Sequence, residues 1–223
     1  LEAAREGEAL TIRLSADHPD AAQLLRQLGA ETRGVPDKGS GRLDALWRGR
    51  LDGPMSANVN ARLAGAALGF DGAMELAPLV QGRAPWLRGR ASLEAADATP
   101  LLQALDLVSP NLAAKGSVDV EADVETVDGA LAVADLRGWA FASRVAGQAR
   151  WRPPAPEADI RRPRLAGALT LDRLSLADIA ALAFGFEPGA QPAQWSQRGF
   201  GPALLDAPDT ALDLTVARFE LDR

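Results

Sequence analysis

The sequence predicts a mainly β fold. In it, an elongated, curled antiparallel sheet forms a groove or half-barrel from repeated multi-strand units, with short amphipathic helices between the units. Apolar and polar residues alternate with a period of two along most of the chain, which is typical of half-buried strands. The pair Asp128-Gly129 is a strong signal for a hairpin turn. A strand followed by a short helix also recurs along the chain, and internal repeats are typical of stacked architectures.

The strand-then-helix element is clearest between residues 163 and 184. Its alternation ends at Ser175, which forms a helix-start signature with Asp178, because both side chains can accept hydrogen bonds from the free amides of a first turn. A second copy lies at 85–105, a shift of 78 residues (163 − 85), with Asp97 at the position of Ser175. We therefore expect a short helix after each of these strands.

A fainter copy lies between residues 10 and 29. Here Asp17 is the expected helix cap and Pro19 the start of the helix, where the missing N–H of proline costs nothing. Because the chain begins with Leu1 rather than Met, we expect it to be a fragment of a longer protein. The three copies divide a single elongated domain into approximate units, at residues 1–84, 85–162 and 163–223.

About nine strands follow the alternation in chain order. In the last of them, Phe219 and Leu221 fall out of phase with Val216, and a β-bulge near Ala217 would restore the register. The proline-rich segment 153–163 is expected to be a connection at the edge of the sheet. The strands are expected near residues 43–51, 55–63, 68–76, 87–93, 118–125, 130–136, 145–151, 165–171 and 212–216.

Each predicted strand has one apolar and one charged face, as in antiparallel sheets with one solvated side. About nine strands, spaced ~4.8 Å apart and ~25 Å long, present on the order of 1,000 Å² of apolar face. Three helices of about ten residues cover roughly 450 Å² of it. About half of the face therefore needs another cover, either from the sheet curling on itself or from a further apolar partner.

Composition narrows the classes of function. The 223 residues carry a net charge of −6, which disfavours nucleic acid as a partner because phosphate binding needs a basic surface. The chain has no cysteine, which excludes disulfide scaffolds and thiolate metal sites but leaves the compartment open. No run approaches the roughly 18 apolar residues of a membrane span, and no signal peptide is present.

No residue pattern supports catalysis, so we expect a protein that is not an enzyme and needs no cofactor or metal. His18 is the only histidine, which excludes a histidine-based triad, and its place at a predicted helix start favours a capping or surface role. The acidic row at 119–125 offers oxygen ligands that suit Ca²⁺, but the same spacing is typical of a solvated strand face. The arginine cluster at 161–164 could contact phosphate headgroups, although a solvated loop is favoured.

The C-terminal stretch 195–221 resembles the AsmA family of bacterial envelope proteins. In that family a Trp-Ser pair is followed by a short apolar segment, then by Leu and by an alternating strand. The matching residues here are Trp195-Ser196, Phe200, Leu204-Leu205 and the strand that follows Asp209. The family usually has a proline near Gly199, and this sequence departs from it there.

The resemblance extends over most of residues 85–223. The element at 163–184 is similar to the family's recurring strand-then-helix segment, and residues 129–151 resemble its glycine-punctuated hairpins. The resemblance implies a periplasmic protein, anchored in the inner membrane by a helix outside this chain and linked to outer-membrane biogenesis. AsmA-like proteins are similar to bridge-like lipid carriers, whose curled sheet forms an apolar groove. Phospholipid acyl chains would then supply the missing cover, since each buried CH₂ contributes about 0.8 kcal/mol.

The resemblance implies no catalytic residues, and it leaves protein partners in the envelope open. An alternative from another class is a non-enzymatic scaffold or regulator of outer-membrane protein assembly, whose sheet closes into its own core. The many Ala and Gly residues on the inward faces favour such close packing. The residues expected to face a lipid groove are Ile12, Leu14, Val59, Leu93, Val118, Val120, Val124, Leu131, Val133, Leu169, Leu171, Leu212, Leu214 and Val216.

Overall fold

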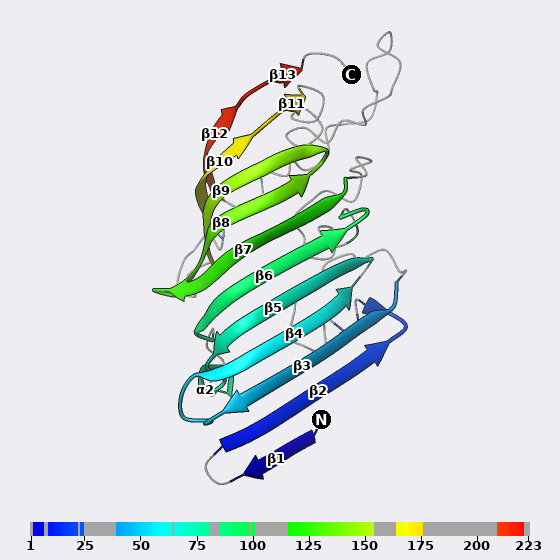
Figure 1. Ribbon diagram of the computed structural model, residues 1–223, viewed down its shortest axis with the longest axis vertical. Coiled ribbons are helices and arrows are strands. Elements are labelled where there is room, and N and C mark those ends of the chain that lie inside the picture. Colours follow the sequence, from blue (N-terminus) through cyan, green and yellow to red (C-terminus); the bar gives the residue numbers. More distant parts are fainter. Residues whose placement is uncertain are drawn as a thin grey trace.

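The computed structural model describes residues 2–6, 9–21, 23–24, 39–63, 65–80, 85–98, 100, 116–153, 164–175 and 209–220. Most of these residues lie in strands (Figure 1). The strands are β1 (Glu2–Glu6), β2 (Ala9–His18), β3 (Gly41–Gly49), β4 (Met55–Leu63), β5 (Ala66–Met74), β6 (Leu87–Ala95), β7 (Val118–Val127), β8 (Ala130–Ala140), β9 (Ser143–Arg152), β10 (Arg164–Leu171), β11 (Leu174–Ser175), β12 (Asp209–Val216) and β13 (Phe219–Glu220).

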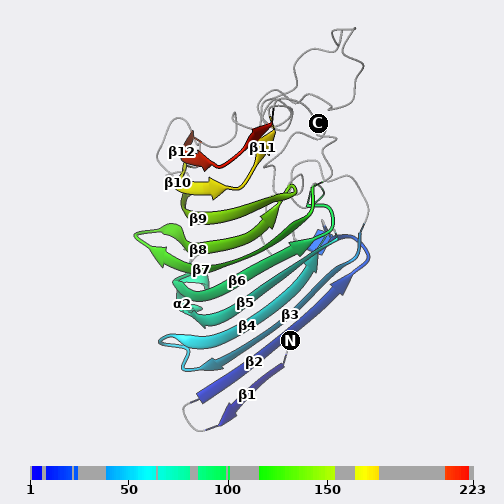
Figure 2. The ribbon, with the colours of Figure 1, turned by 45° about the horizontal axis from the view of Figure 1, so that its top comes forward.

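One sheet of eleven strands dominates the molecule, in the order β1 to β10 followed by β12. Every neighbouring pair is antiparallel except β10 and β12, which run parallel. The short strands β11 and β13 form a separate parallel pair. Among the described strands, β1 and β12 end the sheet without pairing to each other, so the sheet is open. The predicted mainly β fold is therefore confirmed, and the sheet is mostly antiparallel, although the parallel pair β10 and β12 departs from the prediction. Figure 2 shows that the strands also bend along their length.

Rows of directly opposed residues cross the sheet, and such residues share one face because neighbouring strands are pleated in step. One row runs without interruption from β2 to β12 and contains only apolar residues and glycine. We call it the Val120 row. Its members are Ala16, Leu43, Ala61, Leu68, Leu93, Val120, Gly138, Val145, Leu171 and Val216.

The pairing register within β2–β5 recurs within β6–β9, apart from the irregularity in β8. The backbone N–H of Ala21 donates to the carbonyl oxygen of Gly39 at 2.8 Å, and 77 residues later (98 − 21) Ala98 donates to Gly116 at the same distance. Both alanines are buried where the chain leaves the sheet, after β2 and after β6. Ser175, another 77 residues on, is buried as well. Strands β2–β5 and β6–β9 are thus two copies of one structural repeat.

The first predicted helix begins later than expected. Asp17 lies within β2, and the side-chain oxygen Oδ1 of Asp20 accepts a hydrogen bond from the backbone N–H of Gln23 at 3.3 Å, as an N-cap does. The helix cap is therefore Asp20 and not Asp17. The physical reason is Pro19, because a residue before proline is held in extended backbone, which keeps β2 going to His18.

The other two predicted helices lie outside the described residues, and one helical turn was not predicted. Residues 21, 23 and 24 have helical backbone, but the predicted helices at 101–105 and 176–184 lie outside the described residues. The single turn α2 (Ala77–Val80) was not predicted. Strand β1 was not predicted either.

The bulge expected near Ala217 is wrong. Strands β10 and β12 are both interrupted at the same level, at 172–173 and 217–218, and the offset between partners is 45 residues on either side of the break (216 − 171 and 219 − 174). No extra residue is inserted there. The register shifts instead in β8, between Val133 and Leu136, where Asp135 has a positive φ of 47°.

Candidate functional site

The register assigns one side of the sheet to residues without charge, and we call this side the apolar face. Beside the Val120 row lies a second row, which we call the Ala122 row: Leu14, Ala45, Val59, Phe70, Ala91 and Ala122, continued beyond the β8 irregularity by Leu136, Gly147, Leu169 and Leu214. From β2 to β12, no described residue that the register places on this face is Asp, Glu, Lys or Arg. The face is therefore continuous in its chemistry across ten strands.

All fourteen residues predicted to line a groove lie on the apolar face. Val120, Leu93, Leu171 and Val216 belong to the Val120 row, and Leu14, Val59, Leu169 and Leu214 belong to the Ala122 row. The remaining six flank these rows: Ile12, Val118, Val124, Leu131, Val133 and Leu212. The period-two alternation therefore placed each of these side chains on one common surface.

The opposite face, which we call the polar face, carries charge pairs between neighbouring strands. Arg137 of β8 lies 2.8 Å from Glu121 of β7, and Arg90 of β6 lies 3.2 Å from Asp123. Two members of the acidic row are thus neutralised by arginines on either side, as a solvated strand face predicts. Within the described residues, no group of three His, Asp or Glu side chains could hold a metal ion.

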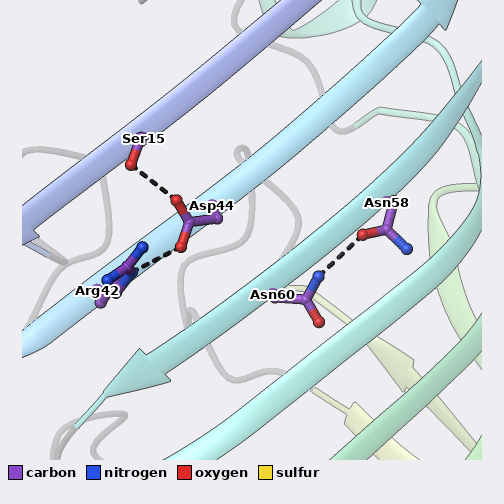
Figure 3. A network of polar contacts seen from close by, with 5 residues as sticks. All are labelled: Ser15, Arg42, Asp44, Asn58 and Asn60. Carbon is purple, nitrogen blue, oxygen red and sulfur yellow. Dashed lines mark hydrogen bonds and ion pairs between the residues drawn. The ribbon is translucent and has the colours of Figure 1, made fainter.

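A second polar network lies on β2, β3 and β4 (Figure 3). Asp44 accepts hydrogen bonds from Arg42 and from Ser15, both at 2.7 Å. These two bonds, that from Arg42 first, hold the pKa of the Asp44 carboxyl below its ordinary value. Asn60 donates to Asn58 on the same strand at 2.8 Å. The polar side chains of this network therefore satisfy one another.

A hollow of about 360 Å³ lies on the apolar face over strands β4 to β8. Ala91 and Ala122 directly face each other across β6 and β7, and the larger side chains of Phe70 and Leu136 flank them in the Ala122 row. Ser92 and Glu121 also border the hollow, but they oppose each other in a row of the polar face, where the Glu121 carboxylate bonds Arg137. The side chains that face the hollow are therefore apolar.

The margins of the apolar face are covered to different degrees. Near the end of β2, Ala21 and Leu24 pack on Leu43 and Leu63 in a buried cluster. A matching cluster beside β6 and β7 contains Ala98. At the far end of the sheet, Leu214 is 50% exposed. The uncovered part of the face, as far as the described residues form it, is therefore mainly apolar.

The other residues singled out in the sequence have structural partners or lie outside the described ranges. The ring nitrogen Nδ1 of His18 lies 2.9 Å from the backbone nitrogen of Asp20, which fits a capping role at the end of β2. Arg164 pairs with Asp209 of β12 at 3.4 Å, and the rest of that arginine cluster is not described. Asp178 is likewise outside the described residues.

Sequence reasoning missed one polar cluster at the margin of the apolar face. The hydroxyl of Ser143 donates to Oδ1 of Asp172 at 2.8 Å, and the same oxygen accepts from the backbone N–H of Arg144 at 2.7 Å. The guanidinium Nε of Arg173 donates to the carbonyl oxygen of Ala142 at 2.6 Å. These groups come from two segments about 30 residues apart, and no sequence motif marks them.

No protein-family model, curated protein or solved structure matches this chain. The AsmA resemblance therefore remains a prediction. None of the helices in the described ranges has the length and apolar character needed to cross a membrane.

Proposed function

We propose that this chain is a periplasmic segment of an AsmA-like, inner-membrane-anchored protein that binds or conducts phospholipid and supports outer-membrane biogenesis. The observation that carries the proposal is the uncharged apolar face, which extends from β2 to β12 on an open sheet. In this proposal the bent sheet of Figure 2 acts as a groove or half-barrel with acyl chains on its floor. The protein is not an enzyme, and its ligand is held by contact area.

The free energies of burial and of association favour reversible binding of the lipid. About ten buried methylene groups contribute roughly 8 kcal/mol at ~0.8 kcal/mol each. That gain is similar to the ~4–15 kcal/mol that association costs in lost freedom of motion. A chain lying on the hollow alone would therefore bind weakly, and firm binding needs contact further along the apolar face. Such a balance suits a carrier, because a ligand held only by apolar contact can slide without breaking specific bonds.

Mass spectrometry of the bound lipid tests the proposal directly. The purified chain is extracted with organic solvent, and the extract is expected to contain phospholipid in a reproducible ratio to protein. A consistently lipid-free protein would count against the proposal.

A charge placed on the apolar face sharpens the test. Leu169→Asp puts a carboxylate in the Ala122 row, and we expect loss of lipid with the circular dichroism spectrum retained. Ala166→Asp is the matched control, because Ala166 is exposed on the polar face of the same strand, opposite Arg150. It should leave the lipid content unchanged.

The alternative function is a non-enzymatic scaffold or regulator of envelope assembly whose sheet packs into a closed core. The buried alanines Ala66, Ala95 and Ala98, which pack closely beside Val118, favour it. It predicts that Leu169→Asp unfolds the chain rather than releasing lipid, so the same variant separates the two functions.

A further inference from the structure

We infer that the hollow over Ala91 and Ala122 takes a single unbranched acyl chain, with Phe70 on one side of the chain and Leu136 on the other. The inference rests on the proposed function, and it deepens it by naming the class of ligand that the site accepts. A pair of chains lying side by side and a fused-ring lipid are excluded from this hollow.

The depression follows from residue size along the Ala122 row. Phe70, Ala91 and Ala122 come from the adjacent strands β5, β6 and β7, and Leu136 follows on β8. Two methyl side chains thus stand between two large ones. On one side of this pair, Leu93 and Val120 rise in the neighbouring row and close the depression.

The backbone deepens the same region on the other side of the pair. Gly72 and Gly89 face each other across β5 and β6, two residues further along β6 from Ala91. A Cβ atom added to Gly72 would lie 2.6 Å from the Cα atom of Gly89, so the two strands leave no room for side chains between them. In that direction the floor stays low over β5 and β6, while on β7 the side chain of Val124 stands opposite Gly89 and bounds the depression.

The dimensions fit one chain. Strands β5 and β8 are three strand spacings apart, about 14 Å, and the side chains of Phe70 and Leu136 fill part of that width. A cavity of about 150 Å³ holds one benzene ring of six carbon atoms, so a hollow of about 360 Å³ has room for roughly 14 carbon atoms, on the order of one acyl chain. Two chains or a sterol skeleton need a larger space.

The chemistry of the lining fits the same ligand. Along the Val120 row and the Ala122 row, the side chains that face the hollow are hydrocarbon only, so no group there would recognise a hydroxyl or a phosphate. The nearest carboxylate, that of Glu121, is bonded to Arg137 on the other side of the sheet. The hollow therefore selects by width and not by polar contacts.

Titration with two fluorescent lipids tests the inference on the delipidated chain. cis-Parinaric acid represents a single unbranched chain, and cholestatrienol represents a fused-ring lipid. We expect the wild-type chain to bind cis-parinaric acid and not cholestatrienol. Ala122→Phe places a ring in the hollow and excludes at least two methylene groups, so it should weaken cis-parinaric acid binding by about tenfold.

A matched control and a second variant complete the design. Ala146→Phe adds the same ring at an exposed position of the polar face on β9, and should leave binding unchanged. If Ala122→Phe does not fold, Ala91→Leu fills the same hollow with a smaller side chain and gives the same readout. Circular dichroism spectra of all variants establish that they are folded.

The outcomes distinguish the inference from the proposed function. If the wild-type chain bound neither probe, both the inference and the proposed function would be overturned. Binding of cis-parinaric acid that Ala122→Phe and Ala146→Phe affect equally would overturn the inference alone, because lipid would then lie elsewhere on the apolar face. Cholestatrienol binding of similar affinity would overturn the selection for a single chain.

Discussion

Met55 and Ser56 are neighbours on β4, but the pleat of the strand turns their side chains to opposite faces of the sheet. Met55 lies on the apolar face and is fully buried, whereas Ser56 is exposed and its hydroxyl donates to the carbonyl oxygen of Arg48 at 3.1 Å. Charged residues make up 24% of the chain. The uncharged face is thus the result of where the charges are placed and not of a shortage of them.

At one margin of the apolar face, a polar contact interrupts the apolar residues. Ala66 and Ala95 face each other across β5 and β6, and both are buried. The positions 77 residues later are Ser143 and Asp172, which hydrogen-bond each other. A polar contact has therefore taken the place of an apolar one at the next copy of the same position. The Asp172 carboxylate is satisfied there by three donors: the hydroxyl of Ser143 and the backbone N–H groups of Arg144 and Arg173.

The largest expected effect separates the two faces on one strand. Met55→Ala removes a fully buried side chain and should lower the free energy of unfolding by about 3 kcal/mol. Ser56→Ala, the matched control one residue away, should change it by less than about 0.5 kcal/mol. Urea unfolding of both variants measures the difference. Similar losses for the two variants would mean that the two faces do not differ in burial.

An intermediate effect is expected where the apolar face becomes polar. Ser143→Ala removes the hydroxyl that joins Asp172 to the sheet, and should destabilise the chain by about 1–2 kcal/mol. The reverse exchange at the earlier copy, Ala66→Ser, buries a hydroxyl among apolar neighbours and should also destabilise, by about 1–3 kcal/mol. If Ala66→Ser leaves the free energy of unfolding unchanged, a serine is tolerated equally at both positions, and the polar contact of Ser143 is not required by its surroundings.

The contact between Ser143 and Asp172 also makes the stability of the chain depend on pH. The hydrogen bond from Ser143, together with those from the backbone of Arg144 and Arg173, holds the pKa of the Asp172 carboxyl below its ordinary value of 3.8. A carboxyl whose pKa is lower in the folded state stabilises the fold above its unfolded pKa, and this stabilisation is lost as the pH falls through the folded value. Melting temperatures of the wild type and of Asp172→Asn should therefore differ at pH 7 and converge below the ordinary range of aspartate. A difference in melting temperature that did not change with pH would mean that the charge of Asp172 does not contribute to stability.

The sequence predicted the faces well because their signal is local. Each strand shows which residues share a side through its own period of two, so Leu169 and Val120 could be placed on one face although 49 residues separate them (169 − 120). The direction of pairing carries no such signal. Alternation looks the same in parallel and antiparallel strands, and the parallel pair β10 and β12 was therefore not foreseen.

The features that the sequence did not predict depend on long-range geometry or on small residues. Ala91 and Ala122 fit a core as well as a binding surface, and only the register shows that they lie together between larger side chains. Asp17 and Asp20 flank Pro19 with equal capping chemistry, and the length of β2 decides between them. Asp135 and its positive φ gave no turn signal inside an alternating strand.

The smallest expected effect concerns the charge pairs of the polar face. Arg137 and Glu121 lie 2.8 Å apart, yet their side chains are 58% and 44% exposed, so water screens the attraction and holding two long side chains in place costs entropy. Arg137→Gln should therefore leave the urea midpoint unchanged at physiological salt, and a small loss should appear only at low ionic strength, where screening is weaker. A loss as large as that of Met55→Ala, insensitive to salt, would mean that the polar face is covered rather than solvated. The ion pair would then be shielded from water, and a binding partner would have to cover the polar face, opposite the hollow.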